Sequence, residues 1–210
     1  MDFKGISREN KIYLLIAFFI LIIILFTAII SSSSITEAYV KDDALGNDWY
    51  EDIDERYLDS QLFNLEKQAS FTYQVDNSTY PSFLTVNTYK TIFMMNEKEL
   101  FEKTIESIES YAKTKNLSLY HNSSDIEDRT LLNGHKTKHI IYNGSISKKE
   151  GIEKIKIIGE TWNCEKSGTS IIVVGFSQIT NSSVDSNKKY LGFWNEIIKE
   201  DGLIYNVKCH

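Results

Sequence analysis

The sequence contains two cysteines, Cys164 and Cys209, whose chemistry is that of a disulfide or of two separate thiols. An even number of cysteines outside the cytosol favours a bridge, because disulfides persist in oxidising compartments. A bridge would close a loop of about 45 residues and hold down the last predicted strand, which the chain-entropy model values at about 3 to 4 kcal/mol. We therefore predict a Cys164–Cys209 disulfide, with two unrelated thiols as the alternative.

Two histidines four positions apart, His135 and His139, would share one face of a helix and could bind a metal ion there. The preceding Asn133-Gly134 pair predicts a strand instead, in which residues four apart are separated by about 13 Å and cannot bind one ion together. No pair of possible ligands has the spacing of a zinc motif, although one of these histidines could still combine with His121, Cys164, Cys209 or His210. The sequence therefore predicts no metal site and no cofactor.

The remaining reactive side chains show no arrangement that is typical of an active site. Glu160 and Glu165 could lie near each other, but carboxylates at the end of a strand are more often surface charges. The nucleophile-elbow, zinc-protease, phosphate-loop and dinucleotide-binding motifs are all absent from the sequence. We assign no catalytic residue and expect a non-catalytic protein, with an extracytoplasmic enzyme or metal-dependent factor as the alternative.

Five N-x-S/T sequons are candidate glycosylation sites, and all of them fall in predicted turns or at strand boundaries, where an acceptor is exposed. Their acceptors are Asn77, Asn116, Asn122, Asn143 and Asn181.

The charge of the chain argues against nucleic-acid binding. Lys and Arg number 23 against 29 Asp and Glu, a net charge of −6, and no basic block interrupts the acidic total. A nucleic-acid-binding protein shows a basic patch or stripe. We therefore expect no nucleic-acid partner.

An apolar run near the N-terminus predicts a membrane anchor. Residues 12–30 contain no charged residue, Pro or Gly, and as a helix they would span roughly 28 Å, close to the hydrocarbon thickness of a bilayer. Lys4, Arg8 and Lys11 precede the run, so the positive-inside rule places residues 1–11 in the cytoplasm. The sequence thus predicts a single-pass cell-membrane protein that contacts membrane lipid through this signal anchor. A cleaved signal peptide is the alternative.

The segment that follows, residues 31–68, resembles an acidic stalk. Four serines begin it, and between residues 41 and 59 eight acidic residues against two basic ones should keep its first part extended. Within it, Trp49, Ile53, Tyr57 and Leu58 recur at helical spacing. The pattern predicts a short amphipathic helix over 48–66 that docks on the following domain.

Residues 69–210 are enough for one folded domain outside the cell. Strands are predicted over 70–75 and 83–93, and then a helix that Asn96 caps, with Glu99 three residues later and a stop at Asn116. Further strands are predicted over 117–121, 128–132, 136–142, 154–162 and 169–177, the last covered on both sheet faces. A second helix over 188–200 and a strand over 203–207 complete an α+β domain with one antiparallel sheet and two helices packed on it.

This order of elements is similar to the PsbP and Mog1 type of α/β fold. The resemblance covers about residues 69–208 and rests on an early strand pair, a helix, an antiparallel meander and a late helix. Members of that fold group are mostly binding or accessory proteins, which implies the same for this chain. We therefore expect a non-catalytic binding or accessory domain at the cell envelope, with an envelope protein as its partner.

Overall fold

The computed structural model describes residues 13, 15–24, 34–61, 66–76, 79–121, 126–149, 151–181, 185–189 and 191–210. Among these residues no helix is both long enough and apolar enough to cross a membrane. This finding corrects the predicted transmembrane anchor over 12–30 and the single-pass localisation. The cytoplasmic tail predicted over 1–11 lies outside the described residues.

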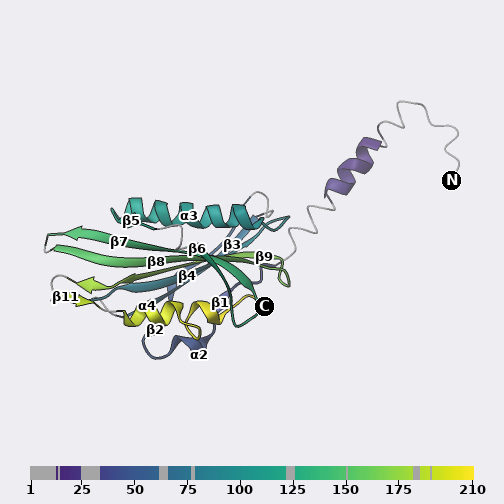
Figure 1. The fold of residues 1–210 in the computed structure, drawn as a ribbon. Coiled ribbons are helices and arrows are strands. Elements are labelled where there is room, and N and C mark those ends of the chain that lie inside the picture. Colours follow the sequence, from purple (N-terminus) through teal and green to yellow (C-terminus); the bar gives the residue numbers. More distant parts are fainter. Residues whose placement is uncertain are drawn as a thin grey trace, which may run out of the picture.

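An eight-stranded antiparallel sheet forms the centre of the fold (Figure 1). Its strand order is β2-β3-β4-β9-β8-β7-β5, and β6 also pairs with β7. The strands are β2 Trp49–Gln61, β3 Glu66–Val75, β4 Ser82–Lys90, β5 Ser118–Tyr120, β6 Ile126–Thr130, β7 Lys136–Lys148, β8 Gly151–Cys164 and β9 Thr169–Gln178. The predicted antiparallel sheet and the α+β class are confirmed.

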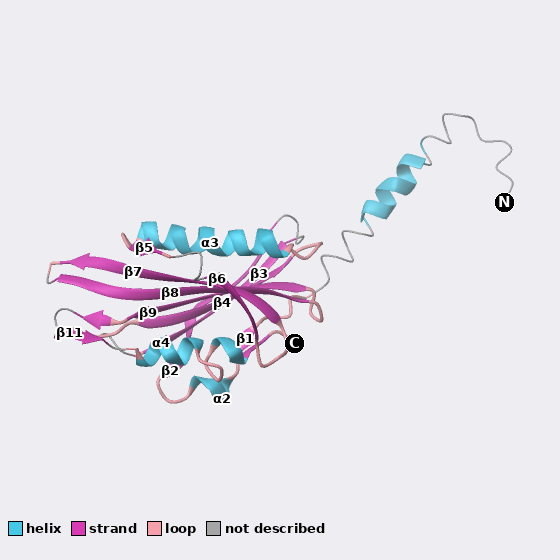
Figure 2. Ribbon diagram, viewed as in Figure 1, coloured by secondary structure: helices cyan, strands magenta, loops and turns pink. Residues whose placement is uncertain are grey.

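Helices cover both faces of this sheet, as the colouring in Figure 2 shows. Helix α3, Glu97–Thr114, lies on one face, and α4, Gly192–Ile198, lies on the other beside α2, Asp42–Leu45. Gly159 of β8 is the point of closest approach to α3, because a Cβ there would lie 2.6 Å from Thr104 and from Ile108. The strand β9 lies between β4 and β8 and is buried along almost its whole length. Its predicted place at the centre of the sheet is confirmed.

Two local signals act as the sequence predicts. The side chain of Asn96 accepts a hydrogen bond from the backbone N–H of Glu99 at 2.9 Å and so caps the first turn of α3. Asn116, at φ +53°, follows the other end of the helix, where a left-handed residue ends helices. Gly134, at φ +84°, completes the tight connection between β6 and β7, as the Asn-Gly pair predicts.

The predicted acidic stalk and its helix over 48–66 are wrong. Residues 49–61 form strand β2, which pairs with β3 through a register shift between Asp52 and Tyr57. Upstream of it, Ala38 and Val40 are buried in the main core, and their backbone N–H groups donate to Thr88 Oγ1 and Tyr73 Oη. The apolar residues whose spacing predicted a helix lie in a strand, and two of them, Ile53 and Leu58, are exposed.

The last predicted strand also differs from the structure. Residues 204–206 form a 3₁₀ helix, η2 Ile204–Asn206, and only β12, Val207–Lys208, is extended. It pairs with β1, Tyr39–Val40, and not with the central sheet. The predicted helix over 188–200 is shorter, because residues 185–189 form β11, Asp185–Lys189, which pairs with β10, Thr180–Asn181.

Candidate functional site

A pocket of about 440 Å³ opens beside the first turns of α3. It lies over β6, β7 and β8 and falls within the volume range of small-molecule sites. Side chains of both charges line it together with polar groups, and they include Glu97, Leu100, Asp128, Lys136, Lys138, Thr161 and Asn163. The alternation of β7 brings Lys136 and Lys138 to the same face. Neither lysine, nor Glu97 or Asp128, forms an ion pair within the part of the chain that the structure describes.

Thr161 provides an unusual group in this pocket. The residue is 4% exposed, and its Oγ1 has no hydrogen-bond partner in the described structure. A buried hydroxyl without a partner costs about 1 to 3 kcal/mol. The neighbouring Asn163 is fully engaged in contrast, since it donates to the carbonyl of Met95 and accepts from Ser170. Thr161 therefore lines a pocket with charges of both signs and carries a buried hydroxyl that has no partner among the described residues.

Arg129 also lines the pocket, and it forms an internal ion pair with Glu160. Glu160 is fully buried, and its carboxylate accepts from Nε and Nη2 of Arg129 and from the hydroxyl of Thr137. Burial alone lowers the pKa of Arg129, but the hydrogen bonds and charge of Glu160 raise it above its usual value. Because Arg129 neutralises Glu160, this carboxylate is not one member of a catalytic pair with Glu165.

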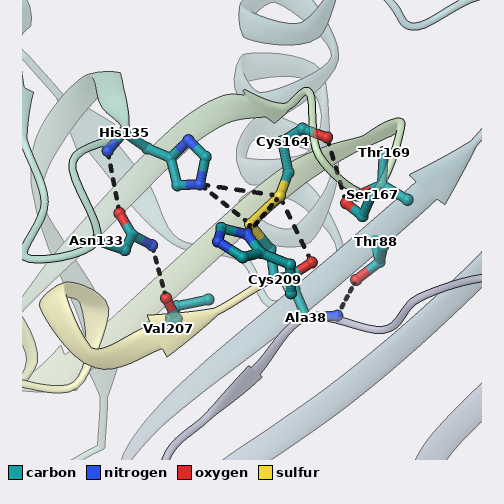
Figure 3. The surroundings of a disulfide bond; sticks show 10 residues. Ala38, Thr88, Asn133, His135, Cys164, Ser167, Thr169, Val207 and Cys209 are labelled. Atoms are coloured by element: carbon teal, nitrogen blue, oxygen red, sulfur yellow. Dashed lines mark hydrogen bonds between the residues drawn. A yellow bond between two sulfur atoms is a disulfide. The ribbon is translucent and has the colours of Figure 1, made fainter.

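The predicted disulfide is confirmed. Cys164 at the end of β8 and Cys209 after β12 are bonded, with Cα atoms 6.5 Å apart, and both side chains are buried. Figure 3 shows the bridge between the end of the sheet and the segment that carries Val207. Asn133 ties a third segment to it, because its side chain accepts from the N–H of His135 and donates to the carbonyl of Val207.

Two histidines adjoin the disulfide sulfurs. Nε2 of His135 lies 3.3 Å from Sγ of Cys209 and 3.8 Å from Sγ of Cys164, and Figure 3 shows this ring facing the bridge. Nδ1 of His210 lies 3.4 Å from Sγ of Cys164 and 3.5 Å from Sγ of Cys209. Burial, and secondarily the nearby His210, lower the pKa of His135. We refer to His135, Cys164, Cys209 and His210 as the Cys–His cluster.

The other histidines that the sequence considers lie elsewhere. His139 is buried on β7, and burial lowers its pKa. His121 packs edge-on against Tyr142, with ring centroids 4.7 Å apart. The sequence thus offered the members of the Cys–His cluster among several alternatives, and tertiary structure selects four of them.

The candidate glycosylation sites fall in different surroundings. Asn116 lies in the turn after α3, as predicted, whereas Asn143 lies inside β7. Asn181 is 8% exposed and donates a hydrogen bond to the carbonyl of Thr79. Asn143 therefore lies inside a strand and not at a turn or boundary, whereas Asn181 lies at the end of β10 but is buried. Asn77 and Asn122 lie outside the described residues.

A second hollow lies on the other flank of the start of α3. It has a volume of about 590 Å³ and is lined in part by Ile92, Phe93 and Met94. These residues belong to the connection between β4 and α3, and Phe93 is 85% exposed. Charged side chains complete the lining of this hollow, among them Glu66, Glu99 and Lys103.

Comparison with known proteins finds no matching family model, no matching curated protein and no matching solved structure. The resemblance to the PsbP and Mog1 fold group stays a prediction from element order.

Proposed function

We propose that this domain binds a small polar ligand carrying charges of both signs in the pocket beside α3, and that it does so without catalysis. The observation that carries the proposal is the buried hydroxyl of Thr161. This residue lines the pocket of about 440 Å³, and its Oγ1 has no hydrogen-bond partner among the described residues. A ligand atom that bonds this hydroxyl would recover a hydrogen bond that the free protein lacks.

The charged rim of the pocket indicates the chemical class of the ligand. Lys136 and Lys138 can attract a carboxylate, while Glu97 and Asp128 can attract an ammonium group. Leu100 adds a small apolar surface at the same site. Amino acids and short peptides combine these features, so zwitterions of this kind are the ligands that the pocket fits best.

Non-catalytic binding agrees with the chemistry of the site. The internal carboxylate nearest to the pocket is neutralised by Arg129, and Thr161 has no hydrogen-bonded base that could make it a nucleophile. The pocket can therefore hold and orient a ligand, and the hydroxyl of Thr161 is not activated to attack it.

A calorimetric titration with a panel of amino acids and dipeptides tests the proposal, with neutral sugars and simple monocarboxylates as the comparison ligands. We expect a zwitterion to bind and Thr161→Val to weaken its binding about 3- to 10-fold, the value of one neutral hydrogen bond. Thr85→Val is the matched control, because its hydroxyl is 3.3 Å from that of Thr72 and does not line the pocket. Equal binding by both variants, or no binding across the panel, would contradict the proposal.

A further inference from the structure

We propose that the Cys–His cluster is a redox-controlled zinc site, in which the disulfide form is the metal-free state and reduction creates a Cys₂His₂ centre. The four possible ligand atoms, one from each of His135, Cys164, Cys209 and His210, all lie within 4.8 Å of one another. This inference concerns a site separate from the pocket beside α3 and does not depend on ligand binding there.

The distances between sulfur and nitrogen atoms match a tetrahedral centre. With Zn–S bonds near 2.3 Å and Zn–N bonds near 2.05 Å, each S···N edge of a tetrahedron is about 3.6 Å. The four edges in this structure are 3.3, 3.4, 3.5 and 3.8 Å. Each imidazole nitrogen therefore already lies at about the S···N edge length of a tetrahedral site from both sulfurs.

The set of donors selects the metal. Two thiolates and two neutral imidazoles are a common ligand set of structural zinc, and borderline-soft sulfur and nitrogen donors exclude magnesium and calcium as good occupants. Two thiolates also cancel the charge of the ion. Zinc can consequently occupy a site where Cys164 and Cys209 are both buried, without leaving an unpaired charge inside the protein.

The scaffold holds three of the ligands before any metal arrives. His135 follows the β6–β7 turn, and its N–H donates to Asn133, whose amide is bonded to Val207 just before Cys209. Cys164 ends β8, and its carbonyl accepts from the N–H of Gly168 and the hydroxyl of Ser167. Of the four residues in the Cys–His cluster, only His210 is exposed. The ligand-bearing segments are thus positioned by contacts that do not involve the sulfur–sulfur bond.

The switch between the two states balances as follows. A dithiol reductant transfers two electrons and two protons to the Cys164–Cys209 bond, which breaks to give two thiols while the reductant closes to its own disulfide. Zinc then binds the two sulfurs and the two imidazole nitrogens and releases the two thiol protons. The sulfurs must separate to about 3.8 Å, the S···S edge of the same tetrahedron. In the reverse direction a small disulfide accepts the two electrons and two protons and becomes two thiols, while the Cys164–Cys209 bond forms again and the ion is released.

Anaerobic metal titration of the full chain tests the proposal. One sample is kept oxidised and the other is reduced with a dithiol that is then removed, and Zn²⁺ is titrated against a chromophoric chelator. We expect about one equivalent of zinc to bind the reduced protein with proton release, and none to bind the oxidised protein. Co²⁺ used in place of zinc should give the intense visible bands of a tetrahedral thiolate complex in the reduced sample alone.

Two exposed histidines provide a matched pair of variants. His210→Ala should lower the zinc affinity of the reduced protein by more than the roughly 10- to 100-fold that loss of a residue orienting a ligand costs. His121→Ala removes an exposed histidine that is not in the cluster and should leave the affinity unchanged. The proposal is overturned if the reduced protein takes up no stoichiometric zinc, or if the two variants bind zinc equally well.

Circular dichroism of the reduced, metal-free chain distinguishes a damaged fold from an absent site. If reduction loosens the domain, added zinc should restore the spectrum of the oxidised protein, because the metal replaces the bridge between the same segments. A reduced chain that stays unfolded when zinc is added would also overturn the proposal.

Discussion

Arg129 on β6 reaches across β7 to hold the carboxylate of Glu160 on β8 through two of its guanidinium nitrogens. Glu160 has no exposed surface, so removing its partner would leave a buried charge in the interior. We expect Arg129→Met to lower the free energy of unfolding by about 3 to 5 kcal/mol, as measured by urea denaturation.

Arg56→Met is the control for this variant, since Arg56 pairs with Glu51 where both side chains are partly exposed. That pair should contribute no more than about 1 kcal/mol. Equal effects of the two substitutions would show that burial does not set the importance of the Arg129–Glu160 pair.

Gly159 should tolerate no side chain, because α3 packs directly on it. Its Cβ would meet Thr104 and Ile108 at 2.6 Å, and overpacking of this kind costs about 1 to 3 kcal/mol. We expect Gly159→Val to lower the melting temperature and the combination with Ile108→Ala to recover part of the loss. A double variant less stable than the sum of the two single effects would contradict this account.

His139 should make the domain less stable in acid. Burial lowers its pKa in the folded state, so below about pH 6.5 the unfolded chain binds more protons than the folded chain, and stability decreases as the pH falls. Denaturant unfolding at pH 8 and at pH 5.5 measures this dependence. His139→Leu should flatten it, whereas His121→Leu, at an exposed position, should leave it as in the parent protein.

The Cys164–Cys209 bridge should stabilise the domain with little effect on its secondary structure. It closes a separation of 45 residues, for which the chain-entropy model gives about 3 to 4 kcal/mol. We expect the Cys164→Ala, Cys209→Ala double variant to unfold at a lower temperature in the presence of a metal chelator. Two free thiols found by alkylation and intact mass in the oxidised parent protein would refute the bridge itself, and an unchanged melting temperature would refute its contribution.

Elements with strong local signals were predictable from the sequence. The cap at Asn96, the Asn133-Gly134 turn and the β-branched run of β9 each specify a structure within a few residues. Local chemistry decides these elements, because capping, left-handed turns and β-propensity act over short distances.

The misassigned segment shows where local patterns fail. Trp49 is buried, but Ile53 is 72% exposed and Leu58 is 58% exposed in β2, so the helical spacing of apolar residues does not reflect an apolar face. Pairing with β3 determines the conformation of this segment, and a register shift changes which residues face the sheet. Such tertiary pairing overrides local propensity.

The candidate sites also differ in how far the sequence alone could predict them. The disulfide prediction followed from the even number of cysteines and from the location outside the cytosol that was expected for them. The Cys–His cluster, in contrast, joins residues from the β6–β7 turn, the end of β8 and the segment after β12. No spacing along the chain reports that convergence. Thr161 gave no signal at all, because a threonine in a strand is ordinary until its hydroxyl is found buried without a partner.

The pairing of β1 with β12 has a consequence for the order of folding events. Val40 pairs with Val207, so this contact closes a loop that contains the whole central sheet, and the entropy of closing a loop grows with its length. We expect the meander from β7 to β9, whose strands are neighbours in sequence, to form early, and the β1–β12 pair to form last. Oxidation of Cys164 with Cys209 would then join two segments of a nearly finished fold. The amide of Lys41 donates to the carbonyl of Asn206 beside the β1–β12 pair, and pulse-labelling hydrogen exchange during refolding should show it protected after the amides of β8.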